Sequence, residues 1–277
     1  MRFWLRFAGA AVALAVLVWR LGTGPFIDGL RTVDAPALGA AAAIALLTTA
    51  CCAWRWQIVA RCHGIELPLP EAVASYYRSL FLNLTLPGGV VGDVHRGVNH
   101  GIRPVVWERC AGQLVQAVVT VAVLLALPSP LHAVMPLLAI VVVLVLLGVV
   151  LFARRRSPLR AKAWVAIAVA SAVVLAGHVL TFVIAARTAG ADAPLSHVLP
   201  LALLALAAAA LPNVGGWGPR EGATAWLFGA AGLGAQLGVA TAVVYGVMAL
   251  AASLPGAAVL VVAWFRRTRL PWQTANA

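Results

Sequence analysis

Long apolar runs alternate with short basic segments along most of this chain. A helix needs about 20 mostly apolar residues to span the hydrocarbon core of a bilayer. Six runs are long enough, at residues 3–21, 35–54, 105–127, 131–152, 163–186 and 235–265, so the pattern predicts six transmembrane helices. The first run begins with basic residues, but no small-residue cleavage site follows it, so we expect a retained span rather than a signal peptide.

Two further apolar runs are too short to span comfortably. Residues 72–86 and 198–211 hold about 15 residues each, and each run ends in a break rich in proline and glycine. Segments of this length are more often interfacial or re-entrant than spanning. Irregular backbone is tolerated at membrane depth only where it lines a cavity enclosed by protein or filled with water. The two breaks are therefore the first candidates for a functional site.

Composition places most of the chain in lipid. Apolar residues make up 63% of the 277 residues and charged residues 10%, against about 25% charged in a soluble domain. This excludes an ordinary soluble enzyme, a disordered protein and a secreted disulfide scaffold, and predicts one integral membrane domain over residues 1–277. The net charge is +12, but the basic residues lie between apolar runs, which indicates membrane topology rather than binding to nucleic acid.

The same basic residues predict the orientation of the chain. If each short run enters and leaves on one side, sixteen basic residues lie in the cytoplasm and four lie outside. If residues 72–86 crossed the membrane alone, eight basic residues would lie inside and twelve outside. The hairpin arrangement therefore agrees with the positive-inside rule, and it places both termini on the cytoplasmic side of the inner (plasma) membrane.

A nine-residue string occurs twice. Residues 61–69 and 187–195 share the pattern R-x-x-G-x-(E/D)-x-P-L. Each copy follows a predicted span and precedes a short apolar run that breaks at Leu-Pro with glycines. Because three spans separate the two copies, they run in opposite directions, which predicts an inverted-topology repeat with halves at residues 35–127 and 163–265. Such repeats place the substrate site near the midplane, at the broken helices of the two halves.

The two breaks carry the candidate binding chemistry. Their glycines leave backbone N–H groups exposed, and a helix that restarts after such a loop points its positive dipole end at the cavity. Arg96 and Arg220 supply forked donors that match phosphate, and Asp93 and Glu221 can balance them when the site is empty. A purely structural role, in topology or in pairing with the nearby acid, stays open for both arginines. The candidate substrate-binding residues are Asn83, Pro87, Gly88, Gly89, Gly92, Asp93, Arg96, Pro212, Asn213, Gly215, Gly216, Gly218, Arg220 and Glu221.

The two breaks resemble the signature stretches of a known family. P-G-G-V-V-G-D-V-H-R at residues 87–96 and L-P-N-V-G-G-W-G-P-R-E at residues 211–221 are similar to those of the lysylphosphatidylglycerol synthase transmembrane-region family, also called flippase-like domain proteins. Val91 stands where the first pattern prefers glycine. The resemblance covers residues 35–265 and implies translocation of a lipid or lipid-linked substrate. No soluble aminoacyltransferase domain follows the last predicted span, so lysyl transfer from tRNA is not expected of this polypeptide.

We therefore expect a transporter that moves an amphipathic lipid with an anionic headgroup, or a lipid-linked substrate, between leaflets, and not an enzyme. A membrane-embedded lipid-modifying enzyme and a scaffold subunit of a lipid or glycan synthase stay open as alternatives. The six histidines and four cysteines are scattered and form no recognisable ligand pattern, so neither a metal nor another cofactor is expected. A partner synthase and a homo-oligomer stay open as assemblies.

Overall fold

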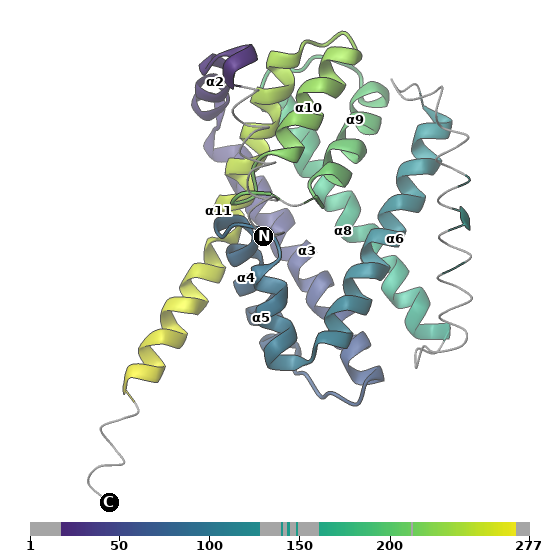
Figure 1. Cartoon of the computed structure of the whole chain (residues 1–277), viewed down its shortest axis with the longest axis vertical. Helices are drawn as coiled ribbons and strands as arrows, with labels where there is room; N and C mark the ends of the chain where they lie inside the picture. The colour runs from purple at the N-terminus through teal and green to yellow at the C-terminus, as the bar shows by residue number, and fades with distance from the viewer. Residues whose placement is uncertain are drawn as a thin grey trace, which may run out of the picture.

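A computed structural model describes residues 18–127, 140, 143, 144, 148, 161–211 and 213–269. Helices joined by short loops make up this part of the chain (Figure 1). A helix satisfies its own backbone hydrogen bonds, which is what a lipid solvent requires of a spanning segment. The helices are α2 (Gly24–Thr32), α3 (Ala35–Cys62), α4 (Leu69–Thr85), α5 (Val91–His100), α6 (Ile102–Ala126), α8 (Ala161–Thr188), α9 (Leu195–Ala208), α10 (Pro219–Ala230) and α11 (Ala235–Arg269).

Four described helices are long and apolar enough to cross a membrane: Ala35–Cys62, Ile102–Ala126, Lys162–Thr188 and Ala235–Phe265. They confirm the spans predicted at residues 35–54, 105–127, 163–186 and 235–265, so the chain is an all-α, multi-pass membrane protein. The span predicted at residues 131–152 lies outside the described residues, apart from four single positions. The span predicted at residues 3–21 also lies outside them, apart from its last four residues.

Helix α3 continues beyond Trp54, where the apolar run ends. The next residue, Arg55, breaks the hydropathy pattern but not the helix, because its side chain is buried and ion-paired with Glu108 on α6. A guanidinium that is ion-paired inside the bundle does not have to reach the water at the membrane surface. The apolar run therefore marks only part of the helix.

Both copies of the repeated string form the same helix-ending turn. Gly64 follows α3 with φ +74° and Gly190 follows α8 with φ +94°, in the left-handed region that favours glycine. In each copy the next amide donates to a carbonyl five residues back, Ile65 to Ala60 at 3.0 Å and Ala191 to Ala186 at 2.9 Å. The proline of each string then directly precedes the following short helix, α4 or α9. The repetition in sequence is thus a repetition of local structure.

The short helices pack against the long ones. Helix α3 packs against α8 and α4, α11 packs against α4 and α10, and α9 packs against α10 and α8. In Figure 1, α4 and α5 lie toward the lower end of the bundle, and α9 and α10 lie toward its upper end. Each pair of short helices therefore reaches the bundle from a different end.

Glycines allow two helices to approach α4 very closely. A Cβ built on Gly256 of α11 would lie 2.1 Å from the carbonyl oxygen of Tyr77. A Cβ built on Gly92 of α5 would lie 2.1 Å from the carbonyl oxygen of Ser79. Small residues at helix contacts are the usual means of close packing in membranes, where lipid provides no hydrophobic drive between helices. The backbone of α4 is thus held between α5 and α11.

Gly256→Ala should therefore lower the stability of the protein. The added methyl group meets backbone rather than a movable side chain, and overpacking of this kind costs about 1–3 kcal/mol. The matched control is Gly39→Ala on α3, where an added Cβ meets nothing within 4 Å, so the midpoint should stay constant or rise. Thermal unfolding of the purified protein in detergent measures both midpoints. Equal midpoints for the two variants would contradict the close packing of α4 against α11.

Candidate functional site

The loop after α4 and the loop after α9 lie against each other. The Gly88 N–H donates to the carbonyl oxygen of Asn213 across 2.9 Å. A Cβ on Gly89 would lie 2.6 Å from the side-chain nitrogen of Asn213, and Gly89 also has a φ of +67°, so glycine is required there. The two breaks identified in the sequence therefore form one region of the molecule.

An asparagine side chain shapes each of these loops. The Asn83 side-chain oxygen accepts from the Gly92 N–H at 2.7 Å, and its nitrogen donates to Asp93 at 3.2 Å. In the second loop, the Asn213 side-chain oxygen accepts from the Gly216 N–H at 2.9 Å. Side-chain bonds to backbone amides are a usual way to fix a turn. Polar contacts thus hold both loops, and the second loop also packs Trp217 against an apolar cluster of Ala225, Val239 and Val243.

Helix α10 begins directly after Gly218, which has a φ of +120°. One carboxylate oxygen of Glu221 accepts from the Gly218 N–H at 2.6 Å, and the other accepts from Arg220 at 2.5 Å. Glu221 is fully buried, and Arg220 is 4% exposed. The Glu221 carboxylate therefore caps the helix and balances the arginine beside it.

A cavity of about 530 Å³ lies between the long helices and the two loops. Its charged lining residues are Asp93, Arg109 and Arg220. The amide side chains of Asn83, Asn213, Gln113 and Gln116 also line it. Further polar side chains and apolar side chains from α3, α4, α8, α9 and α11 complete the wall, the polar ones being Thr48, Thr49, His178, Thr181, Tyr245 and Ser253. The volume falls in the usual range of ligand sites, and a wall that is partly polar and partly apolar suits an amphipathic ligand.

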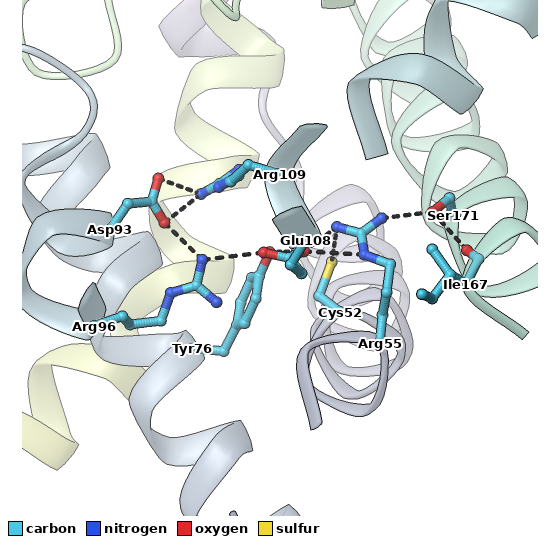
Figure 2. A network of polar contacts seen from close by, with 9 residues as sticks. All are labelled: Cys52, Arg55, Tyr76, Asp93, Arg96, Glu108, Arg109, Ile167 and Ser171. Carbon is cyan, nitrogen blue, oxygen red and sulfur yellow. Dashed lines mark hydrogen bonds and ion pairs between the residues drawn. The ribbon is translucent and has the colours of Figure 1, made fainter. Parts of the chain in front are cut away.

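A network of ion pairs from α3, α5 and α6 lies beside this cavity (Figure 2). The carboxylate of Asp93 accepts from Arg96 at 2.8 Å and from Arg109 at 2.7 Å. The carboxylate of Glu108, which is fully buried, pairs with Arg96 at 3.3 Å and more closely with Arg55. Two carboxylates thus hold three guanidinium groups from three helices.

Asp93 stays ionised in this setting. Its burial alone would raise the pKa of the carboxyl group, but attraction by Arg109 and Arg96, together with the hydrogen bonds that both donate, outweighs burial and lowers the pKa below its usual range. The network therefore keeps the negative charge that holds Arg96 and Arg109 in place.

Arg96 lies behind the wall of the cavity rather than in it. Its side chain is fully buried, and its guanidinium lies 4.7 Å from the ring centre of Trp56 and 4.2 Å from that of Tyr76. Within the described part of the chain, its Nε and Nη1 atoms have no hydrogen-bond partner, so the two aromatic faces supply part of the stabilisation. Arg220 likewise lies 4.9 Å from the ring centre of Tyr245, but it reaches the cavity.

Half of the predicted site residues line the cavity: Asn83, Gly88, Gly89, Asp93, Asn213, Gly216 and Arg220. Gly92, Arg96 and Glu221 are buried behind the wall, and Gly215 and Gly218 form the turn of the second loop. Pro87 is exposed beside the first loop, and Pro212 lies outside the described residues.

The sequence analysis missed three residues of the network. Arg55 and Arg109 were only counted among the cytoplasmic basic residues, whereas the structure places each of them within a helix and in an ion pair. Glu108, which pairs with Arg55 and Arg96, was not among the candidates either. Its signal was present, since a carboxylate inside an apolar span is costly and usually functional.

Replacing Glu108 should destabilise the protein strongly. Glu108→Gln removes the charge that compensates Arg55 and Arg96 inside the bundle, and breaking a buried pair in this way costs about 3–5 kcal/mol. Glu66→Gln in the exposed turn before α4 is the control and should leave the unfolding midpoint unchanged. Thermal unfolding in detergent measures the difference. A Glu108→Gln protein as stable as the parent would show that the network does not hold the helices together.

Comparison with known proteins agrees with the sequence resemblance. Residues 3–166, more than half of the chain, match the family model described as the Lysylphosphatidylglycerol synthase TM region. The matched part contains the first loop and all five charged residues of the ion-pair network, and it does not reach the second loop. No curated protein matches the chain. With four apolar helices long enough to span, the chain belongs to the lysylphosphatidylglycerol synthase transmembrane-region family.

Proposed function

We propose that this protein moves an amphipathic lipid, or a lipid-linked substrate, with an anionic headgroup between the leaflets of the cell membrane. The cavity carries the proposal, because both loops and the charged and amide side chains of the adjoining helices line one space inside an apolar bundle. Long helices expose apolar side chains such as Val169 and Leu180 on their outer faces. The headgroup of such a lipid needs the polar groups inside the bundle, while its apolar acyl tails can stay in the surrounding lipid. The family name, which refers to the membrane region of a phospholipid synthase, supports a lipid substrate.

We further propose that α4–α5 and α9–α10 are two opposed re-entrant hairpins of an inverted-topology repeat. Three observations support this arrangement. Each hairpin follows the same helix-ending turn, the two pairs of helices lie toward different ends of the bundle in Figure 1, and their loops touch at Gly88 and Asn213. Halves that meet at broken helices are typical of secondary transporters.

The corrected charge distribution supports the same orientation. Arg55, Arg96 and Arg109 are taken from the sixteen basic residues assigned to the cytoplasm, and Arg220 from the four assigned outside, because all four are ion-paired inside the bundle. Thirteen then remain against three, which agrees with the positive-inside rule. We therefore propose that both termini are cytoplasmic.

Transport is favoured over catalysis and over a scaffolding role. The charged groups at the cavity are already paired, Asp93 with Arg109 and Arg220 with Glu221, so an anionic headgroup can bind by exchanging partners. A scaffold for a synthase would gain nothing from the cost of placing such groups at membrane depth. An embedded lipid-modifying enzyme and a synthase subunit are the competing functions, and neither requires exchange of lipid between leaflets.

Leaflet exchange of fluorescent lipid in proteoliposomes tests the proposal. The parent protein should accelerate exchange of an anionic phospholipid over protein-free vesicles. Arg220→Ala should slow this exchange about tenfold or more, because a charge-assisted hydrogen bond contributes about 1.5–3 kcal/mol. Arg220→Lys keeps the charge but loses the fork, so it should slow exchange less.

Arg61→Ala is the matched control for this experiment. Arg61 is exposed at the end of α3, away from the residues that line the cavity, so its loss should leave exchange at the parental rate. Unfolding midpoints must show that each variant is folded. A folded parent protein that does not accelerate exchange would refute translocation and favour the enzyme or scaffold.

Labelling with a membrane-impermeant maleimide tests the opposed orientation. The equivalent positions Glu66 and Asp192 of the repeated string are both exposed, so single cysteines can replace them after Cys51, Cys52, Cys62 and Cys110 are removed. Asp192→Cys should react in intact cells, and Glu66→Cys should react only after permeabilisation. Reaction of both positions from the same side would contradict the inverted repeat.

A further inference from the structure

Helix α6 carries a stripe of polar side chains that belongs to neither of the two loops. Arg109, Gln113, Gln116 and Thr120 follow one another at intervals of four, three and four residues, so they lie on one face of the helix. The first three line the cavity. Eleven residues of helix rise about 16 Å, roughly half of the hydrocarbon core. The stripe thus leads from the ion-pair network along the cavity into an otherwise apolar helix.

Several polar atoms of this stripe are left without partners. Within the described part of the chain, Nε of Arg109, Nε2 of Gln116 and Oγ1 of Thr120 are buried and make no hydrogen bond. A buried donor without a partner costs about 1–3 kcal/mol, so such groups are normally satisfied by a ligand, by water or by protein. Three of them along one helix face, beside a cavity, indicate a place built to hold a polar ligand.

Arg109 is the arginine of the network that reaches this cavity from α6. Its side chain is 38% exposed, whereas the side chain of Arg96 is fully buried. In Figure 2, Asp93 and Arg109 form one end of the network, and the buried pair of Glu108 and Arg55 lies toward its other end. A ligand can therefore contact Arg109 without disturbing the buried part of the network.

The charge balance identifies the ligand more closely. The ion pairs at and beside the cavity join four guanidinium groups, those of Arg55, Arg96, Arg109 and Arg220, to three carboxylates. One positive charge is therefore left over. A ligand with one net negative charge would neutralise it, whereas a zwitterion would leave it and a cation would add to it.

We propose that Arg109, Gln113 and Gln116 form a binding site for a headgroup that contains a phosphodiester and carries one net negative charge. The guanidinium of Arg109 donates to the phosphate oxygens, and the amides of Gln113 and Gln116 donate to phosphate and exchange hydrogen bonds with polar substituents of the headgroup. This site deepens the proposed function, on which it rests, and none of its three residues belongs to the signature loops.

Native mass spectrometry of the purified protein tests the site without any transport step. The parent protein in non-ionic detergent is mixed with equal amounts of phosphatidylglycerol, which is a monoanionic phosphodiester, and phosphatidylcholine, which is zwitterionic, with the same acyl chains. The parent should retain phosphatidylglycerol preferentially. Arg109→Gln should reduce this preference at least about tenfold, and the Gln113→Leu, Gln116→Leu double variant at least about threefold.

Two control variants on the same helix lie outside the site. Arg103→Gln removes one positive charge at an exposed position near the start of α6, and Val118→Leu changes an exposed apolar residue, so both should keep the parental preference. Inorganic phosphate, added in excess, should compete poorly, since it lacks the acyl chains and the headgroup substituents. Displacement of phosphatidylglycerol by phosphate at equal concentration would indicate a free-phosphate site and overturn the headgroup assignment.

An unchanged preference in folded Arg109→Gln and in the folded double variant would also overturn the site. If only one of them fails to fold, the other decides the outcome. The Gln113→Leu, Gln116→Leu double variant leaves the ion pair of Arg109 with Asp93 intact. The exchange assay separates this result from the proposed function. A parent protein that binds phosphatidylglycerol selectively without exchanging it would refute translocation and leave the site standing.

Discussion

The carboxylate of Glu108 holds two guanidinium groups from different helices inside a bundle where neither would be stable alone. Arg55 comes from α3 and Arg96 from α5, so one acidic side chain on α6 fixes the relative positions of three helices. Arg96 in turn orients Asp93, which positions Arg109 at the cavity. In a solvent of low polarity such a chain cannot be broken at one point without leaving an uncompensated charge. The polar wall of the cavity therefore depends on a residue that does not touch the cavity.

The two loops meet through few, specific contacts. The Gly88 N–H donates to the Asn213 carbonyl, Gly89 and Gly216 leave room for the side chains of Asn213 and Leu84, and asparagine side chains hold the turns. The helices around them are held in a different way, through closely packed small residues such as Gly256 against α4. The bundle thus combines tightly packed helices with a polar, lightly connected interior, which suits a protein whose interior must accept a ligand.

The sequence predicts those features of this protein that lipid imposes directly. A long apolar run in a membrane protein indicates a spanning helix, and breaks such as Pro87 to Gly89 interrupt these runs visibly, so four of the predicted spans and both loops are confirmed. The pairing of Arg55 with Glu108, 53 residues apart, could not be predicted, because it depends on how α3 and α6 are rotated against each other. The same holds for Arg96, whose type suggests ligand binding but whose place between Trp56 and Tyr76 is decided by packing. Arg220 and Glu221 are neighbours in the chain, so their pairing needed no tertiary information.

The distribution of charge along the chain has a consequence for membrane insertion. All five charged residues of the network lie between positions 55 and 109, and the remaining pair at the cavity consists of the neighbours Arg220 and Glu221. Asp93 and Glu221 therefore emerge from the ribosome close to an arginine with which they pair, Arg96 and Arg220, whereas Arg55 is synthesised 53 residues before Glu108. The first half of the chain contains both carboxylates that pair with its three network arginines, and it is complete before α8 to α11 have been synthesised. The hydrogen bond from Arg55 to Ser171 on α8 forms later, once the second half is in place.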